Sequence, residues 1–286
     1  MHSVIDTDLL TARKLRAARQ PVAGADFLAR RLGEDLEDRL ATVVRSFDRA
    51  AVLFSPPATR QALDASGKAA SIVEVGLNRA LAGIDAIVAP AETVPLEPGS
   101  IDLAISLLSL HEVNDLPGLL VQVRRSLKPD GLFLAAMAGG STLTELRQSL
   151  LAAEIELTGG AAPRVIPFAD VRDMGALLQR AGFALPVTDI DTVVVRYDDM
   201  FALLRDLRAM GSTSALSDRS RKPATRTLFA RAAQIYAERF ADADGRVRAT
   251  FDIIWLSGWA PAETQRKPLK PGSAEVSLTK VLGGDA

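Results

Sequence analysis

Residues 91–137 are the stretch that most restricts how this chain can fold. They read AETVPLEPGSIDLAISLLSLHEVNDLPGLLVQVRRSLKPDGLFLAAM. An apolar run typical of a strand follows an acidic turn, and a short polar loop then leads into an amphipathic helical pattern. Pro129-Asp130-Gly131 predicts a turn before the next apolar run, because proline ends the helix and glycine permits a tight bend. The stretch therefore predicts a βαβ crossover, the unit that joins parallel strands.

Other apolar runs extend this sheet. We predict strands at residues 51–54, 71–75, 84–89, 101–108 and 131–137. Near-continuous apolar strands separated by helices are typical of a parallel sheet covered on both faces. Two late β-rich runs, 190–195 and 249–259, enclose two helical segments and predict an antiparallel hairpin at the sheet edge. The predicted fold is α/β and Rossmann-like, with a mostly parallel seven-stranded sheet.

The segments around this sheet divide the chain. Between Phe27 and Phe47 apolar residues recur at helical spacing, so we predict that residues 1–50 form a helical extension. An α/β domain follows over residues 51–260, with a helical insertion at about 197–246. Residues 261–286 are rich in proline, lysine and glycine and predict an extended tail.

Composition excludes several classes of function. Acidic and basic residues nearly cancel, 35 against 34, so charge does not favour nucleic acid as a partner. The absence of cysteine excludes disulfides and thiolate catalysis, and only two histidines disfavour a metal site. No apolar run reaches the roughly 18 residues of a membrane span, although peripheral membrane contact remains allowed. Asp6 and Asp8 interrupt any signal-peptide pattern, so we expect a cytoplasmic protein.

The same central stretch closely resembles the second half of an S-adenosylmethionine (SAM) methyltransferase domain. Five segments carry a wider resemblance: LSLHEVNDLPGLLVQVRRSLKPDGLFLAAMAGGSTLTELRQSL, GGAAPRVIPFADVRDMGALLQRAGFALPVTDID, DLRAMGSTSAL, RATFDIIWLSGWAP and KPLKPGSA. Through them the chain is similar, over about residues 12–275, to the methyltransferase-like assembly factors of respiratory complex I, found in mitochondria and alphaproteobacteria. This likeness implies a methyltransferase fold and a protein partner, an iron–sulfur subunit of complex I. The mitochondrial member is associated with hydroxylation of an arginine in that subunit.

In such a fold the ligand lies at the carboxyl ends of the strands, where the strand order reverses. SAM is usually held by a glycine-rich turn after the first strand, a carboxylate ending the second and an acidic residue after the third. The candidate cofactor contacts here are Ser55, Glu74, Glu92 and Leu108, which ends the fourth strand. Glu74 is equally well explained as an edge-strand carboxylate that points to solvent.

The turn after the first strand departs from this pattern. Phe54-Ser55-Pro56-Pro57 contains no glycine, and its prolines remove backbone donors while its side chains add bulk. Pro90 also replaces the first carboxylate of the usual Asp-Ala-Glu. Because a hydrogen bond to a charged group contributes ~1.5–3 kcal/mol, two such losses weaken binding roughly a hundredfold or more. We therefore expect side chains to fill the cofactor space, and SAM to bind weakly or not at all.

His111 and Glu112 are the candidate catalytic residues, since they follow the fourth strand at the mouth of the sheet. His111 is placed to act as a base, but we favour a structural role at the entry of the next helix. Glu112, where the family commonly has tryptophan, either orients a guanidinium or adds charge to the helix N-terminus.

Nearby polar residues are explained first as helix caps. Asn114 and Asp115 suit N-caps of the helix that follows them, and Ser141 or Thr142 with Glu145 predicts a capping box. The acidic pair in residues 164–173 either caps its own helix, which we favour, or binds an arginine of a partner.

Three functions fit the sequence. The leading hypothesis is a SAM-methyltransferase-fold protein that acts on a complex I subunit, with a degenerate cofactor loop. The alternatives are a scaffold without catalysis and a protein arginine hydroxylase. Hydroxylation needs oxygen activation, and the sequence contains neither a metal triad nor a flavin motif.

Overall fold

The computed structural model describes residues 3–160, 162–221 and 223–265. The elements in these residues follow one another as α1 (Thr7–Arg19), α2 (Phe27–Thr42), β1 (Phe47–Leu53), α3 (Pro57–Ser66), β2 (Ala69–Gly76), α4 (Arg79–Ala82), β3 (Ile87–Val88), β4 (Ile101–Leu107), η1 (Leu110–Glu112), α5 (Leu116–Ser126), β5 (Leu127–Ala138), α6 (Thr144–Thr158), α7 (Val171–Arg180), β6 (Ala184–Tyr197), α8 (Met200–Ala209), α9 (Arg226–Phe240) and β7 (Val247–Trp259).

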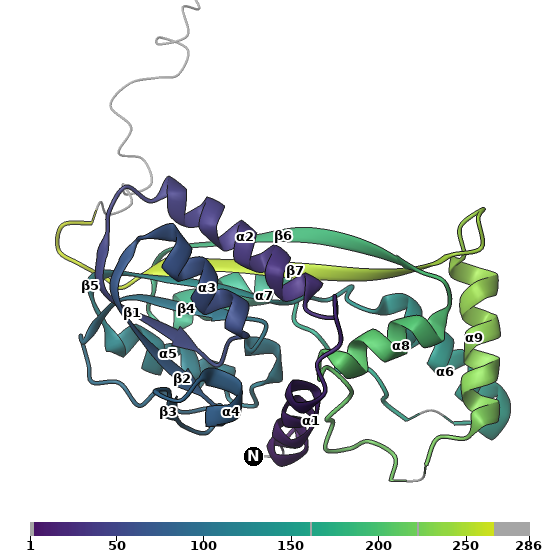
Figure 1. Ribbon diagram of the computed structural model, residues 1–286. Coiled ribbons are helices and arrows are strands. Elements are labelled where there is room, and N and C mark those ends of the chain that lie inside the picture. The colour runs from purple at the N-terminus through teal and green to yellow at the C-terminus, as the bar shows by residue number, and fades with distance from the viewer. Residues whose placement is uncertain (1–2, 161, 222, 266–286) are drawn as a thin grey trace, which may run out of the picture.

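The strands form one seven-stranded sheet in the order β3-β2-β1-β4-β5-β7-β6 (Figure 1). Neighbouring strands are parallel from β3 to β5, and β7 runs antiparallel to both β5 and β6. The predicted Rossmann-like, mostly parallel sheet is confirmed. Because strand order reverses between β1 and β4, the carboxyl ends of these two strands are where a ligand is expected.

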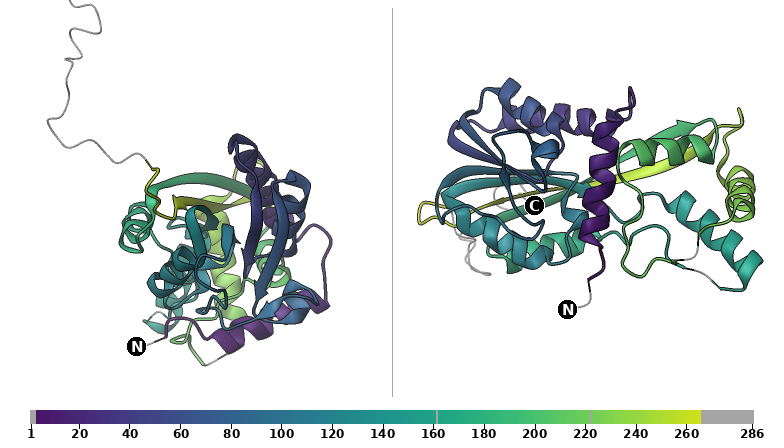
Figure 2. Two further views of the ribbon diagram at one scale, coloured as in Figure 1. Left: turned by 90° about the vertical axis from the view of Figure 1, so that its left-hand side faces the viewer. Right: turned by 60° about the horizontal axis from the view of Figure 1, so that its bottom comes forward.

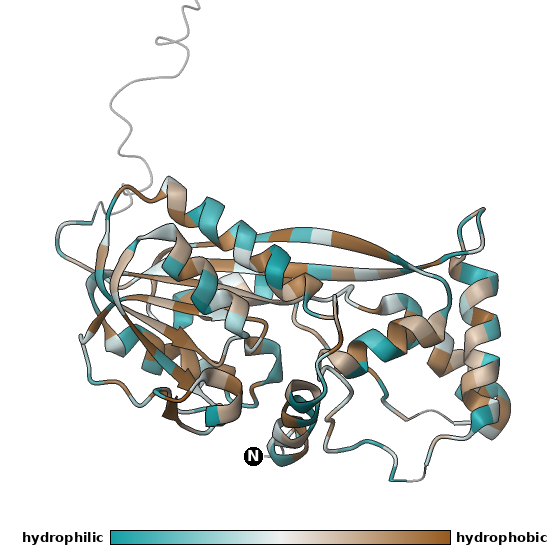
Figure 3. Ribbon diagram, in the orientation of Figure 1, coloured by the Kyte–Doolittle hydropathy of each residue, from teal (hydrophilic) through white to brown (hydrophobic). Residues whose placement is uncertain are grey.

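Helices bury both faces of the sheet. On one face Leu36 of α2 and Leu63 of α3 pack against apolar side chains of β1 and β4, and on the other Leu120 of α5 and Leu178 of α7 do so. Figure 3 shows the apolar strands enclosed between these helices. Each fully buried leucine contributes roughly 1.5–3 kcal/mol, so this layering stabilises the sheet that positions the site.

β6 is much longer than the predicted 190–195, whereas β7 begins only two residues before the predicted 249–259. They contain 14 and 13 residues, and they run from the sheet into a second half of the molecule where α6, α8 and α9 pack (Figure 1). Helix α1 lies across the junction of the two halves (Figure 2). The segment before it is anchored on both sides, because Ile5 exchanges two hydrogen bonds with the Asn114 side chain and forms a β-bridge with Leu216.

The N-terminal helical prediction extends too far. Helix α2 ends at Thr42, Val44 is 99% exposed, and Phe47 is the first residue of β1. Phe47 N donates to Lys68 O at 2.7 Å, so pairing with the chain before β2 overrides the helical period. Most of the predicted tail, residues 266–286, lies outside the described residues.

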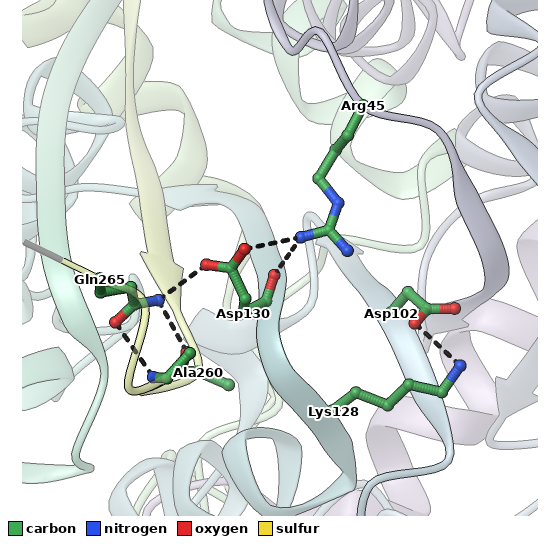
Figure 4. A network of polar contacts seen from close by, with 7 residues as sticks. Arg45, Asp102, Lys128, Asp130, Ala260 and Gln265 are labelled. Carbon is green, nitrogen blue, oxygen red and sulfur yellow. Dashed lines mark hydrogen bonds and ion pairs between the residues drawn. The ribbon is translucent and has the colours of Figure 1, made fainter.

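The Pro-Asp-Gly sequence lies inside β5 rather than between helix and strand, because β5 begins at Leu127. Asp130 takes the left-handed conformation, with φ +64°, and Gly131 allows close packing, since a Cβ there would lie 3.2 Å from Asp102 O. Arg45 Nη1 donates to Asp130 O at 2.5 Å, and Gln265 donates to the Asp130 carboxylate (Figure 4). This network fastens the segment before β1 to β5 and to the end of β7.

The predicted capping box of α6 is wrong. Thr142 Oγ1 donates to Asp252 O and accepts from Asp252 N, while the Glu145 carboxylate accepts from Thr250 N and Oγ1. These side chains therefore join α6 to β7 instead of capping α6.

For two other helices the caps Asp115 and Asp170 are confirmed, but Asn114, whose side chain bonds with Ile5, and Asp173, within the first turn of α7, are not caps. Asp115 Oδ1 accepts from Gly118 N, and Asp170 Oδ1 accepts from Arg172 N. Among the described helices, none is long and apolar enough to cross a membrane.

Candidate functional site

A cavity of about 810 Å³ opens at the carboxyl ends of the central strands and continues between α1, α6 and α8. Its volume lies within the usual range of small-molecule sites. On the sheet side its lining includes Phe54, Ser55, Gly76, Leu77, Leu108 and His111. The cavity thus coincides with the ligand position that the strand order predicts.

Strained backbone conformations are concentrated at this cavity. Phe54, Leu108 and Leu143 have φ values of +51°, +54° and +54°, and all three line it. A non-glycine residue in this left-handed region costs roughly 1–2 kcal/mol. Strain of this kind is typical of functional sites, where the surrounding structure holds it in place. Here strand pairing does so, since Phe54 N donates to Val75 O and Leu108 N to Ala136 O.

The turn after β1 leaves the cavity open. Pro56 and Pro57 line the cavity, so the expectation that side chains fill this space is wrong. Pro57 begins α3, where a missing N–H costs little, and the chain turns directly into the helix. Ser55 also lines the cavity, but its hydroxyl donates to Leu53 O and accepts from Leu107 N, tying β1 to β4.

The two predicted cofactor carboxylates do not line the cavity. The Glu74 carboxylate lies 3.5 Å from Arg60 of α3, and burial raises its pKa while Arg60 lowers it. Glu92 Oε1 accepts from Asn114 N at 3.1 Å. Gly76 and Leu77 line the cavity at the end of β2 instead. The size of the site suits a nucleoside cofactor such as SAM, but these residues do not supply its usual hydrogen bonds.

His111 lies in η1, directly after β4, and is half-buried against the Phe168 ring at 5.9 Å. Its Nδ1 accepts from Ala138 N at 3.4 Å, which places the proton of a neutral imidazole on Nε2. Burial lowers the pKa of His111, while the Glu112 charge raises it. The residue therefore joins η1 to β5 and offers Nε2–H as a donor at the cavity.

Glu112 is 8% exposed and lines the same cavity. Its Oε2 accepts from Lys14 Nζ, which reaches the site from α1. No sequence pattern indicated Lys14 as a site residue, because it belongs to a basic run that fits a solvated helix face.

Arg164 is a second lining residue that sequence reasoning did not place at the site. It binds Glu154 at 2.6 Å, and this hydrogen bond lowers the pKa of Glu154. Arg164 belongs to the charged run 164–173, in which the sequence indicated only the acidic pair as contacts to a partner. No group of three or more acidic or histidine side chains in the described part of the chain is arranged to hold a metal ion.

Comparisons with known proteins define the class. A family model described as "Methyltransferase domain" matches residues 49–135. The YcgJ protein of Bacillus subtilis aligns with a TM-score of 0.53 at 15% identity, covering 81% of this chain and 99% of that one. The [4+2]-cyclase SpnF aligns with a TM-score of 0.50 at 18% identity, covering 89% and 94%. The chain has the Rossmann-like methyltransferase fold.

Curated relatives define the family. The Homo sapiens protein named "Arginine-hydroxylase NDUFAF5, mitochondrial" is 39% identical over 285 residues, 96% of this chain and 82% of that protein. Its namesake from Danio rerio is 46% identical over 192 residues, 67% of this chain and 60% of that protein. The match to the Dictyostelium discoideum namesake spans 43% of that protein. This chain belongs to the arginine-hydroxylase NDUFAF5 family.

Proposed function

We propose that this protein acts in the assembly of respiratory complex I by binding a subunit and modifying one of its arginine side chains. The observation that carries the proposal is the 39% identity, over 96% of the chain, to the human protein named arginine-hydroxylase. Its expected substrate is an iron–sulfur subunit of complex I. A strained, largely apolar cavity with a buried carboxylate supports a site for a side chain of that subunit.

The modification we favour is hydroxylation. It consumes dioxygen and a two-electron reductant: one oxygen atom replaces a C–H hydrogen as hydroxyl, and the other leaves as water. The chain's own contribution is to bind and orient the substrate. Glu112 supplies a charge for the guanidinium, His111 supplies a donor, and apolar walls such as Leu108 exclude bulk water.

We propose that SAM binds this cavity weakly or not at all. Support comes from the prolines after β1 and from Glu74 and Glu92, whose carboxylates have partners outside the cavity. Titration calorimetry with SAM checks this. We expect an affinity roughly a hundredfold or more below that of a methyltransferase site that keeps both of these hydrogen bonds. Micromolar SAM binding would contradict it and favour a methyltransferase.

The function is tested by mass spectrometry of the iron–sulfur subunit from a strain that lacks this protein. We expect one arginine to lose the mass of a single oxygen atom, and complementation with the wild-type chain to restore it. Loss of a methylene mass instead would indicate methylation. An unchanged subunit in a strain with normal complex I would reject the proposal.

A scaffold without catalysis is the second candidate, supported by the same missing cofactor contacts. It predicts that the deletion strain accumulates assembly intermediates while the arginine is unmodified even in wild-type cells. Hydroxylated arginine in wild-type cells that disappears on deletion would reject it.

A further inference from the structure

The described lining of the cavity contains two carboxylates, Asp26 and Glu112. They differ sharply in environment, since the Asp26 side chain is 63% exposed and pairs with Arg30, whereas the Glu112 side chain is 11% exposed. Charge attraction is much stronger where water is excluded. Glu112 is therefore the group at which this cavity can select a cation.

Lys14 forms an ion pair with Glu112. Its side chain is 21% exposed, lines the same cavity and contacts Glu112 Oε2 only, and no described residue donates to Oε1. A lysine ammonium is a point charge, but a guanidinium presents two parallel donors that match both oxygens of a carboxylate. Lys14 thus uses only one of the two carboxylate oxygens of Glu112.

We infer that Glu112 is the receptor for the guanidinium of the substrate and that Lys14 holds this place in the substrate-free protein. The inference rests on the proposed function, because it assumes that the substrate is an arginine. The two cations exchange, so the buried carboxylate is never left without a partner, which would be strongly destabilising. Glu112 determines specificity, and Lys14 is its internal competitor.

The surroundings of the pair permit this exchange. Helix α1 is fastened by contacts that do not involve Lys14, the Ile5–Asn114 hydrogen bonds and an Asp6–Arg219 ion pair at 3.1 Å. The four-carbon lysine side chain can therefore swing towards solvent while α1 stays in place. Arg164, the other half-buried cation of the described lining, does not compete, because Glu154 binds it.

The experiment is calorimetry on the full-length protein with two probes, N-acetyl-arginine amide and its citrulline analogue, which has nearly the same shape without the charge. We expect the wild type to prefer the arginine probe. Lys14→Met removes the competitor and raises arginine affinity about tenfold, the equivalent of ~1.4 kcal/mol. Lys14→Arg competes through two bonds and lowers it, and Glu112→Gln abolishes the preference.

Arg30→Met is the matched control, because it breaks the exposed ion pair at the same cavity and should leave both affinities unchanged. Thermal unfolding of each variant checks the fold, and Lys14→Arg keeps the charge balance if Lys14→Met unfolds. The inference is overturned if Glu112→Gln retains the arginine preference, if wild type and Lys14→Met show none, or if both Lys14 variants shift affinity in one direction.

Its failure is distinct from failure of the proposed function. If cells carrying Glu112→Gln still modify the subunit arginine, the role of Glu112 is rejected while the function stands. If the arginine is modified in the deletion strain as well, the function itself is rejected.

Discussion

His111 is the site residue whose charge depends most on its surroundings. Burial lowers its pKa below the ordinary 6.5, so the unfolded chain takes up a proton at a pH where the folded chain does not. The folded state is therefore favoured above pH 6.5, and this contribution is lost as the pH falls from 6.5 towards the lowered pKa. One proton gives a slope of at most about 1.4 kcal/mol per pH unit.

We predict that His111→Asn removes this slope from the free energy of unfolding, measured by urea denaturation between pH 5 and 7. The carboxylates titrate mostly below that window and are shared by both proteins, so the difference between the two curves reports His111. Parallel curves would show that the imidazole titrates as it does in the unfolded chain.

At this scale the sequence predicted position better than orientation. Ser55, Leu108, His111 and Glu112 do line one cavity, because the carboxyl ends of parallel strands meet at one edge. Glu74 was not predictable in this way: adjacent strand residues point to opposite faces, so a shift of one position moves a carboxylate away from the ligand side.

Among the elements, α1 depends most on contacts that are distant in sequence. It packs against Gly211, where a Cβ would lie 3.1 Å from Lys14 Cα and 3.4 Å from Ala17 Cβ. Neither the close packing at Gly211 nor the Lys14–Glu112 pair can be recognised from neighbouring residues in the sequence. The sequence therefore predicted the helix but not its place over the cavity. The side chains that join α6 to β7 were misread as caps for the same reason.

We predict that Gly211→Ala lowers the free energy of unfolding by roughly 2–3 kcal/mol and increases hydrogen exchange of the α1 amides. A left-handed residue costs roughly 1–2 kcal/mol, and the crowding of α1 adds to it. Gly245→Ala is the control: its φ of +83° carries the same strain, but nothing lies within 4 Å of the added Cβ. Equal effects of the two variants would mean that α1 is not held at Gly211.

In the whole molecule, β6 and β7 pass through both halves and pair with each other from Ala184–Trp259 to Tyr197–Val247. The sequence predicted an edge hairpin but missed residues 184–189 of β6, because Pro186 and Asp189 are residue types that strands disfavour. Continuous pairing favours a single cooperative unit over two separately stable ones. The two tryptophans of the chain, Trp255 and Trp259, lie in the near half of β7, so they can report whether the far half unfolds with it.

Tyr236 tests this cooperativity from the far end. Its buried hydroxyl donates to Arg248 O at 2.8 Å and joins α9 to β7, so Tyr236→Phe should cost about 1 kcal/mol and leave the carbonyl without this donor. If the molecule unfolds as one unit, tryptophan fluorescence and far-ultraviolet circular dichroism shift to the same lower midpoint. Tyr197→Phe is the control, since among the described residues its buried hydroxyl makes no hydrogen bond to α9 or β7 and contacts only Asp206 of α8, and it should change stability by less. A shift in circular dichroism with unchanged fluorescence would instead show that the two halves unfold independently.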